Sequence, residues 1–232
     1  NAFNAWEYGH QSDREDLKAN SMKVFDSYLK NGFTPVGFFK ESVDFDKGYE
    51  DPVHSIRRQS EGIYAMLHFL AYEKENGRRH PEWEQKMKNM LDILLRLQQA
   101  DGSFPRKFRD DFTIVDTSGG STPSATLPLV MGYKYFKDKR YLASAKQTAD
   151  YLEKVLISKA DYFSSTLDAN CEDKEASLYA ATATYYLSLI TKGDEHRHYA
   201  DLTKKAAYFA LSWYYVWDVP FAQGQMLGDI GL

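Results

Sequence analysis

The sequence predicts an all-α fold in which one layer of helices surrounds another. Two kinds of segment alternate along the 232 residues: one is apolar on almost every face, and the other carries a charged stripe. A helix that is apolar all round must be buried all round, whereas a striped helix can meet water on one side. The alternation therefore predicts inner and outer helices, and no segment shows the pattern of a strand ladder.

The expected helices follow from this periodicity and from start signals. Ser12 with Glu15 has the spacing of a capping box, and Pro81 and Pro123 suit the first turn of a helix. We expect outer helices near residues 12–31, 81–99, 139–157 and 195–213. We expect inner helices near residues 52–76, 122–137 and 173–192, all within one domain over residues 1–232.

The connections between helices differ in length. Those that follow inner helices are short and polar, as in tight helical hairpins. Those that follow outer helices are long, near residues 31–51, 101–121 and 158–172 and from 213 onward. Long loops are uncommon in compact domains unless they have a function. They all fall on the face where the inner helices begin, so we expect a functional site there.

Composition excludes several classes of partner. Lys and Arg total 29 against 33 Asp and Glu, a formal charge of −4, so nothing indicates binding to nucleic acid or to an acidic membrane. The longest apolar run, residues 62–71, is too short to cross a bilayer. The single cysteine, Cys171, excludes an intrachain disulfide, and no spacing of His or Cys indicates a metal site. No cofactor is expected.

One motif indicates a family. Residues 98–104 read Gln-Gln-Ala-Asp-Gly-Ser-Phe, in which Asp101-Gly102 forms a turn that ends the outer helix. With the alternating helices, this segment resembles the Q-x-x-D-G-x-W/F element of the six-hairpin glycosidase superfamily, although Phe104 stands where Trp is commoner. The resemblance implies an (α/α) toroid and an enzyme of carbohydrate breakdown, and it favours an extracytoplasmic location. A simpler interpretation makes the motif only a helix terminator.

The pattern accounts for only part of such a toroid. Three inner and four outer helices make about three and a half hairpins, where a closed toroid of this superfamily has six. Both ends of the sequence read as loops. We therefore expect a fragment of a longer chain, an incomplete barrel, with the remainder or a second copy covering the exposed inner helices.

Glycoside hydrolysis needs one protonated carboxyl group and one ionised carboxylate. Asp116, before a Gly-Gly turn, and Glu172, before an inner helix, are the predicted catalytic pair. Glu172 and its neighbour Asp173 have a competing role, because either can cap the helix that follows.

Several residues are predicted to bind the oligosaccharide or polysaccharide substrate. Aromatic side chains stack on the apolar faces of sugars, while carboxylates and arginines bind hydroxyl groups. The predicted binding residues are Arg57, Glu61, Phe104, Arg106, Asp173 and Trp217. Arg57 and Glu61 are four residues apart and should share a helix face, so they can equally pair with each other.

Two other functions remain open. A polysaccharide lyase would use Tyr49 or His54 as base and Arg57 or Arg58 to neutralise a uronate. The acidic character of the long loops argues against such a polyanionic substrate. A helical glycan-binding or scaffold module without catalysis would explain the absence of a sharply spaced motif.

Overall fold

The computed structural model describes residues 2–44, 46–163 and 171–214. Within these ranges the chain forms eight α-helices and two small antiparallel sheets. The helices are α1 (Ala2–Gln11), α2 (Glu15–Asn31), α3 (Ile56–Glu75), α4 (Pro81–Leu97), α5 (Thr122–Phe136), α6 (Lys139–Tyr151), α7 (Lys174–Ile190) and α8 (Gly193–Leu211). A 3-10 turn, η1 (Gly119–Ser121), precedes α5, and α6 continues into a π-helix, η2 (Leu152–Ile157).

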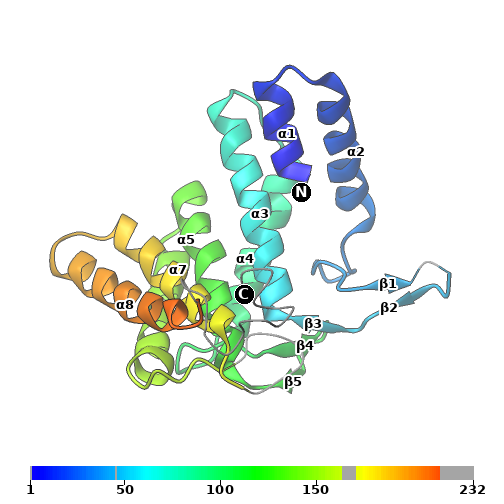
Figure 1. Ribbon diagram of the computed structural model, residues 1–232. Helices are drawn as coiled ribbons and strands as arrows, with labels where there is room; N and C mark the ends of the chain where they lie inside the picture. Colours follow the sequence, from blue (N-terminus) through cyan, green and yellow to red (C-terminus); the bar gives the residue numbers. More distant parts are fainter. Residues whose placement is uncertain (1, 45, 164–170, 215–232) are drawn as a thin grey trace, which may run out of the picture.

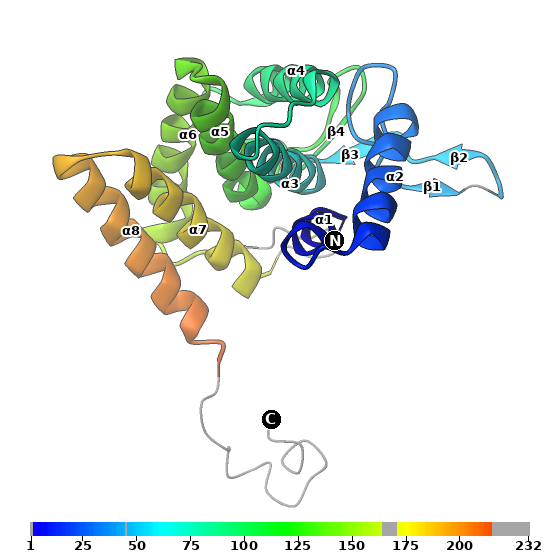
Figure 2. The same ribbon diagram turned by 90° about the horizontal axis from the view of Figure 1, so that it is seen from above.

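The described helices form four consecutive hairpins arranged as a two-layered arc (Figure 2). Helices α1, α3, α5 and α7 form the inner layer, and α2, α4, α6 and α8 form the outer layer. Neighbouring inner helices pack on one another, with α5 between α3 and α7. The predicted all-α fold with inner and outer helices is confirmed. The described helices form an open part of a toroid and not a closed toroid.

Burial follows the two kinds of helix. Every residue of α5 from Thr122 to Gly132 is buried, as expected for a helix enclosed on all sides. The outer helix α4 instead buries a single stripe at helical spacing that includes Trp83, Met87, Leu91 and Leu94. None of the described helices combines the length and apolarity needed to cross a membrane.

The first helix was not predicted. The sequence was interpreted as a loop before residue 12, but α1 occupies this segment and packs on α3 through Phe3 and Trp6, whose rings contact Phe69. The predicted capping box is also wrong. The Ser12 hydroxyl donates to the Tyr8 carbonyl at 2.6 Å in the turn after α1, and α2 begins at Glu15. The arc therefore has four inner helices.

Short strands tie the first two long loops together, contrary to the expectation of no strand ladder. They are β1 (Val43–Asp44), β2 (Tyr49–Glu50), β3 (Val53–Ser55), β4 (Lys107–Arg109) and β5 (Ile114–Asp116). Strand β4 pairs with β3 on one side and with β5 on the other, below the start of α3 (Figure 1). Helix α3 accordingly begins at Ile56 and not at residue 52, because the residues before it belong to β3.

The motif at residues 98–104 holds two outer helices together. The Gln98 amide donates to the Ser144 carbonyl and the Thr148 hydroxyl on α6, each at 3.0 Å. Gly102 has φ +91°, and a Cβ there would lie 2.2 Å from the Gln147 carbonyl oxygen. Glycine is therefore required both for the backbone conformation and for the close approach of α6.

Candidate active site at the mouth of the arc

The inner helices α3 and α7 begin on the same side of the molecule as the β3–β4–β5 sheet, whereas the turns from α1 to α2 and from α3 to α4 lie on the opposite side (Figure 1). The first two long loops meet on this face through the pairing of β3 with β4, as the sequence predicted. Free backbone N–H groups and helix dipoles make such a face suitable for binding polar ligands. We call it the mouth of the arc.

A cluster of four side chains joins α3 to α7 at the mouth. The Arg57 guanidinium lies between two carboxylates, with Nε 3.0 Å from Glu61 Oε1 and Nη1 2.8 Å from Glu175 Oε2. The Tyr179 hydroxyl donates to Glu61 Oε1, and the Arg57 guanidinium lies 5.4 Å from the centre of the Tyr179 ring. These residues, Arg57, Glu61, Glu175 and Tyr179, form the mouth cluster.

The mouth cluster has a fixed pattern of charge and hydrogen-bond donors. Burial, together with the hydrogen bond to Glu61, raises the pKa of Tyr179 to about 12, so this phenol stays neutral and donates. Burial opposes the charge of Arg57, but Glu61, Tyr179 and Glu175 together raise its pKa. The two carboxylates are 44% and 42% exposed and Arg57 only 25%, so an incoming ligand meets acceptor oxygens first.

One step further along the same two helices, a second polar contact joins α3 and α7. The hydroxyl oxygens of Tyr64 and Tyr186 are 2.6 Å apart, and Tyr64 packs edge-on against His68. Burial raises the pKa of Tyr64 and lowers that of His68, so both side chains are neutral at pH 7. The surface between α3 and α7 is thus lined by hydroxyl groups below the charged mouth cluster.

Asp116, one of the predicted catalytic pair, lies at the end of β5. Its Oδ2 is 3.4 Å from Nη1 of Arg106, and its Oδ1 accepts a hydrogen bond of 2.8 Å from the Ser118 N–H. The Arg106 side chain is 7% exposed, so it supports Asp116 from below the surface. The structure therefore brings Asp116 and Arg106 together.

Glu172, the other predicted catalytic residue, lies just before α7. Its Oε2 accepts a hydrogen bond of 3.0 Å from the Tyr162 N–H. Burial raises the pKa of Glu172, and the nearby Asp161 adds to the effect against the opposing hydrogen bond from Tyr162. Asp173 takes the capping role, because its Oδ1 accepts from the Glu175 N–H at 2.8 Å. The hydrogen-bond and ion-pair partners named here therefore differ between the two predicted catalytic residues: Tyr162 contacts Glu172, whereas Arg106 and Ser118 contact Asp116.

The remaining predicted binding residues lie elsewhere. Phe104 is fully buried, and the Thr122 hydroxyl accepts from its N–H at 2.9 Å, so its place is in the packing under the mouth. Trp217 lies outside the described residues. No group of three or more His, Cys, Asp or Glu side chains in the described chain is arranged to hold a metal.

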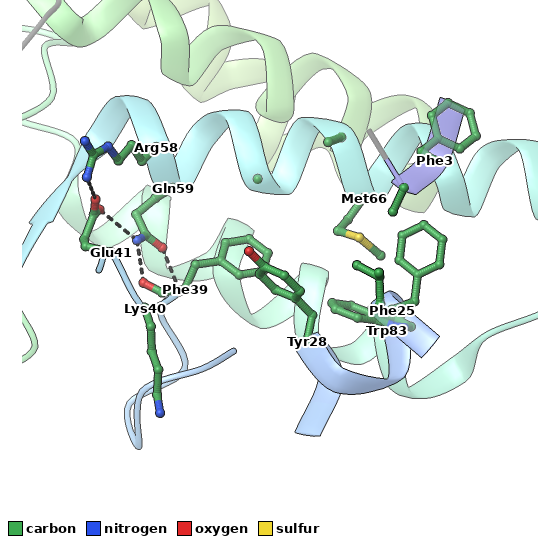
Figure 3. Close-up of a pocket in the computed structure, with 14 residues that line it drawn as sticks. Phe3, Phe25, Tyr28, Phe39, Lys40, Glu41, Arg58, Gln59, Met66 and Trp83 are labelled. Atoms are coloured by element: carbon green, nitrogen blue, oxygen red, sulfur yellow. Dashed lines mark hydrogen bonds and ion pairs between the residues drawn. The ribbon is translucent and has the colours of Figure 1, made fainter. Parts of the chain in front are cut away.

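Of the residues considered for a lyase, Arg57 belongs to the mouth cluster, but His54 and Arg58 do not. His54 is 1% exposed on β3, where Nε2 contacts Asp110 at 2.8 Å, and it is not on α3 as predicted. Arg58 faces a different hollow, an apolar cavity of about 410 Å³ between α2 and α3 (Figure 3). There its guanidinium contacts Glu41, which also accepts from Gln59.

Sequence reasoning did not single out Glu175 or Tyr179 as site residues. They are four residues apart at the start of α7, the same spacing as Arg57 and Glu61 on α3. Two such pairs at the N-terminal ends of two inner helices were a usable signal. What the sequence lacked was the curvature of the arc, which brings α7 opposite α3.

No protein-family model matches the chain. Among solved structures, it resembles the unsaturated glucuronyl hydrolase of Bacillus sp. GL1, described as responsible for the degradation of glycosaminoglycan. The TM-score is 0.65 at 13% identity, over 92% of this chain and 60% of that one. A variant of the hydrolase UGL with dGlcA-Glc-Rha-Glc matches with a TM-score of 0.64 at 13% identity, over 92% and 60%.

An unsaturated glucuronyl hydrolase specific for heparin matches with a TM-score of 0.54 at 20% identity, over 79% of this chain and 52% of that one. The resemblance to the six-hairpin glycosidase superfamily is thereby confirmed at the level of the fold, an incomplete (α/α) toroid. The chain spans between 52% and 60% of the length of these three proteins.

Proposed function

We propose that this protein acts as a glycoside hydrolase and holds its sugar at the mouth between α3 and α7. The observation that carries the proposal is the mouth cluster. Its two carboxylates accept hydrogen bonds from sugar hydroxyls, and the Tyr179 ring offers an apolar surface. The similarity of the fold to hydrolases that act on glycans supports the same class of reaction.

In this proposal Glu172 is the general acid and Asp116 is the base or nucleophile. A general acid must carry a proton that it can give to the leaving group, and the pKa of Glu172 is shifted in that direction, upward from its usual value. Asp116 contacts the Arg106 guanidinium, a partner suited to a carboxylate that acts in its ionised form. The two residues come from different loops of the same face, an arrangement that can place carboxyl groups on either side of a glycosidic bond.

The test of this assignment is the variant Glu172→Gln, with Glu82→Gln on the opposite side of the molecule as the control. Loss of a general acid typically lowers turnover about 10²- to 10⁴-fold, so the first variant should lose activity on a glycan panel while its circular dichroism is unchanged. The control should keep full activity.

The products of the same assay distinguish the alternatives. New reducing ends are the expected result for a hydrolase. An unsaturated product that absorbs ultraviolet light would identify a lyase, and glycan binding without turnover would identify a binding module. Unchanged turnover in Glu172→Gln would remove that residue from the mechanism.

We also infer that further helical hairpins of the same toroid cover the free side of α7. Helix α5 is flanked by inner helices on both sides and is buried, but among the described helices α7 has only α5 beside it in the inner layer. Its free side exposes Leu178, Tyr185 and Leu189, which share one helix face. The greater length of the proteins with this fold supports hairpins as the covering element.

A further inference from the structure

We propose that the mouth cluster selects a neutral sugar over a uronate, so that the bound residue of the substrate carries no carboxylate. The inference rests on the proposed function and specifies its substrate class. It departs from the solved structures of similar fold, which are named for glucuronyl groups. The reason lies in how Arg57 is held.

Arg57 already has two anionic partners. One lies on its own helix and the other on α7, at 3.0 Å and 2.8 Å. A uronate carboxylate could use this guanidinium only by displacing Glu61 or Glu175. Because Tyr179 is neutral, the four side chains carry one positive and two negative charges, so the approaching anion also meets net negative charge.

At the start of α7, where Lys174 is the first residue, the capping position is already taken by a carboxylate. A helix N-terminus favours anions through its dipole and its free N–H groups. Here Asp173 caps the helix and accepts from the Glu175 N–H at 2.8 Å, and Glu172 precedes it. The Asp173 carboxylate thus already takes a backbone N–H that a uronate could otherwise use.

Arg106, next to the β3–β4–β5 sheet on the same face, is held by an acidic partner as well, because it contacts Asp116. The hydroxyl-lined surface beyond the cluster, at Tyr64 and Tyr186, suits neutral hydroxyl groups. These contacts of Arg57 and Arg106 favour ligands that donate hydrogen bonds over ligands that bring negative charge.

The test uses matched sugars that differ only at C6. Methyl glucoside, galactoside and mannoside are each compared with the corresponding methyl uronide by saturation-transfer NMR titration of the full chain at pH 7 and low salt. We expect the neutral member of the best-binding pair to bind about tenfold tighter or more, because like charges repel at the site. The difference should shrink as salt is added.

The variant Glu175→Gln tests the cause. It removes one partner of Arg57 and makes the cluster neutral, so uronate binding should strengthen about tenfold relative to neutral binding. Glu195→Gln is the matched control, because Glu195 is also 42% exposed and forms an ion pair, with Lys146 on α6. The control should leave the ratio unchanged.

The outcomes separate this inference from the proposed function. Tighter binding of the uronide by the unmodified protein overturns the inference and leaves a sugar site at the mouth. Binding of neither member of any pair overturns both. An equal shift in Glu175→Gln and Glu195→Gln rejects the mouth cluster as the source of selectivity.

Discussion

At the scale of single residues, Glu73 shows how the hairpins are fixed on the side away from the mouth. It is 1% exposed near the end of α3 and accepts hydrogen bonds from Trp6 on α1 and from Arg78 and His80 in the following turn. Burial alone would raise its pKa, but these donors outweigh burial and lower the pKa to about 2. The carboxylate therefore joins α1 to the α3–α4 turn in its ionised form.

This network predicts a pH-dependent stability. The folded pKa of Glu73 is about 2 and its ordinary value is 4.5, so its contribution is complete above pH 4.5 and is lost as pH falls toward 2. The shift corresponds to about 3 kcal/mol. Glu73→Gln should lower the urea midpoint at pH 7 and reduce the difference between pH 7 and pH 3. An unchanged pH dependence would show that Glu73 is not ionised in the folded protein.

At the scale of elements, the two sides of α7 differ although both are apolar. Leu187 is fully buried, whereas Leu189 is 59% exposed on the free side. Removing a buried leucine side chain costs both its transfer free energy and the cavity left behind. Removing an exposed leucine side chain costs little transfer free energy and leaves no cavity.

The matched variants Leu187→Ala and Leu189→Ala test this difference by urea unfolding of the chain. We expect Leu187→Ala to lower the free energy of unfolding by about 2–5 kcal/mol. Leu189→Ala should change it by less than about 0.5 kcal/mol. Equal losses would mean that the free side of α7 is already covered in solution, for example by a second copy.

The elements that sequence analysis missed are the shortest ones. Helix α1 has ten residues, too few for its apolar spacing to repeat clearly, and it contains Gly9 and several aromatic residues with modest helix propensity. The strands have two or three residues each, below the length at which alternation is visible. The long helices were predicted because their periodicity extends over several turns.

At the scale of the whole molecule, the sequence predicted the layered arrangement of helices better than the contacts between side chains of different helices. Helical spacing alone placed Arg57 beside Glu61, and the structure shows that pair. Their contact with Glu175 and Tyr179 depends on the curvature of the arc, a tertiary property that no local pattern encodes. Phe104 was expected to face the substrate, but its motif serves to pack α4 against α6 instead.

Hydrogen–deuterium exchange tests the central claim most directly, that a sugar binds where α3 and α7 begin. Exchange is measured for the full chain with and without the neutral methyl glycoside that binds best. We expect slower exchange in residues 56–61 and 174–179, and no change in the short turns at residues 76–80 and 191–193. Slower exchange confined to those short turns, with none at the starts of α3 and α7, would contradict the claim.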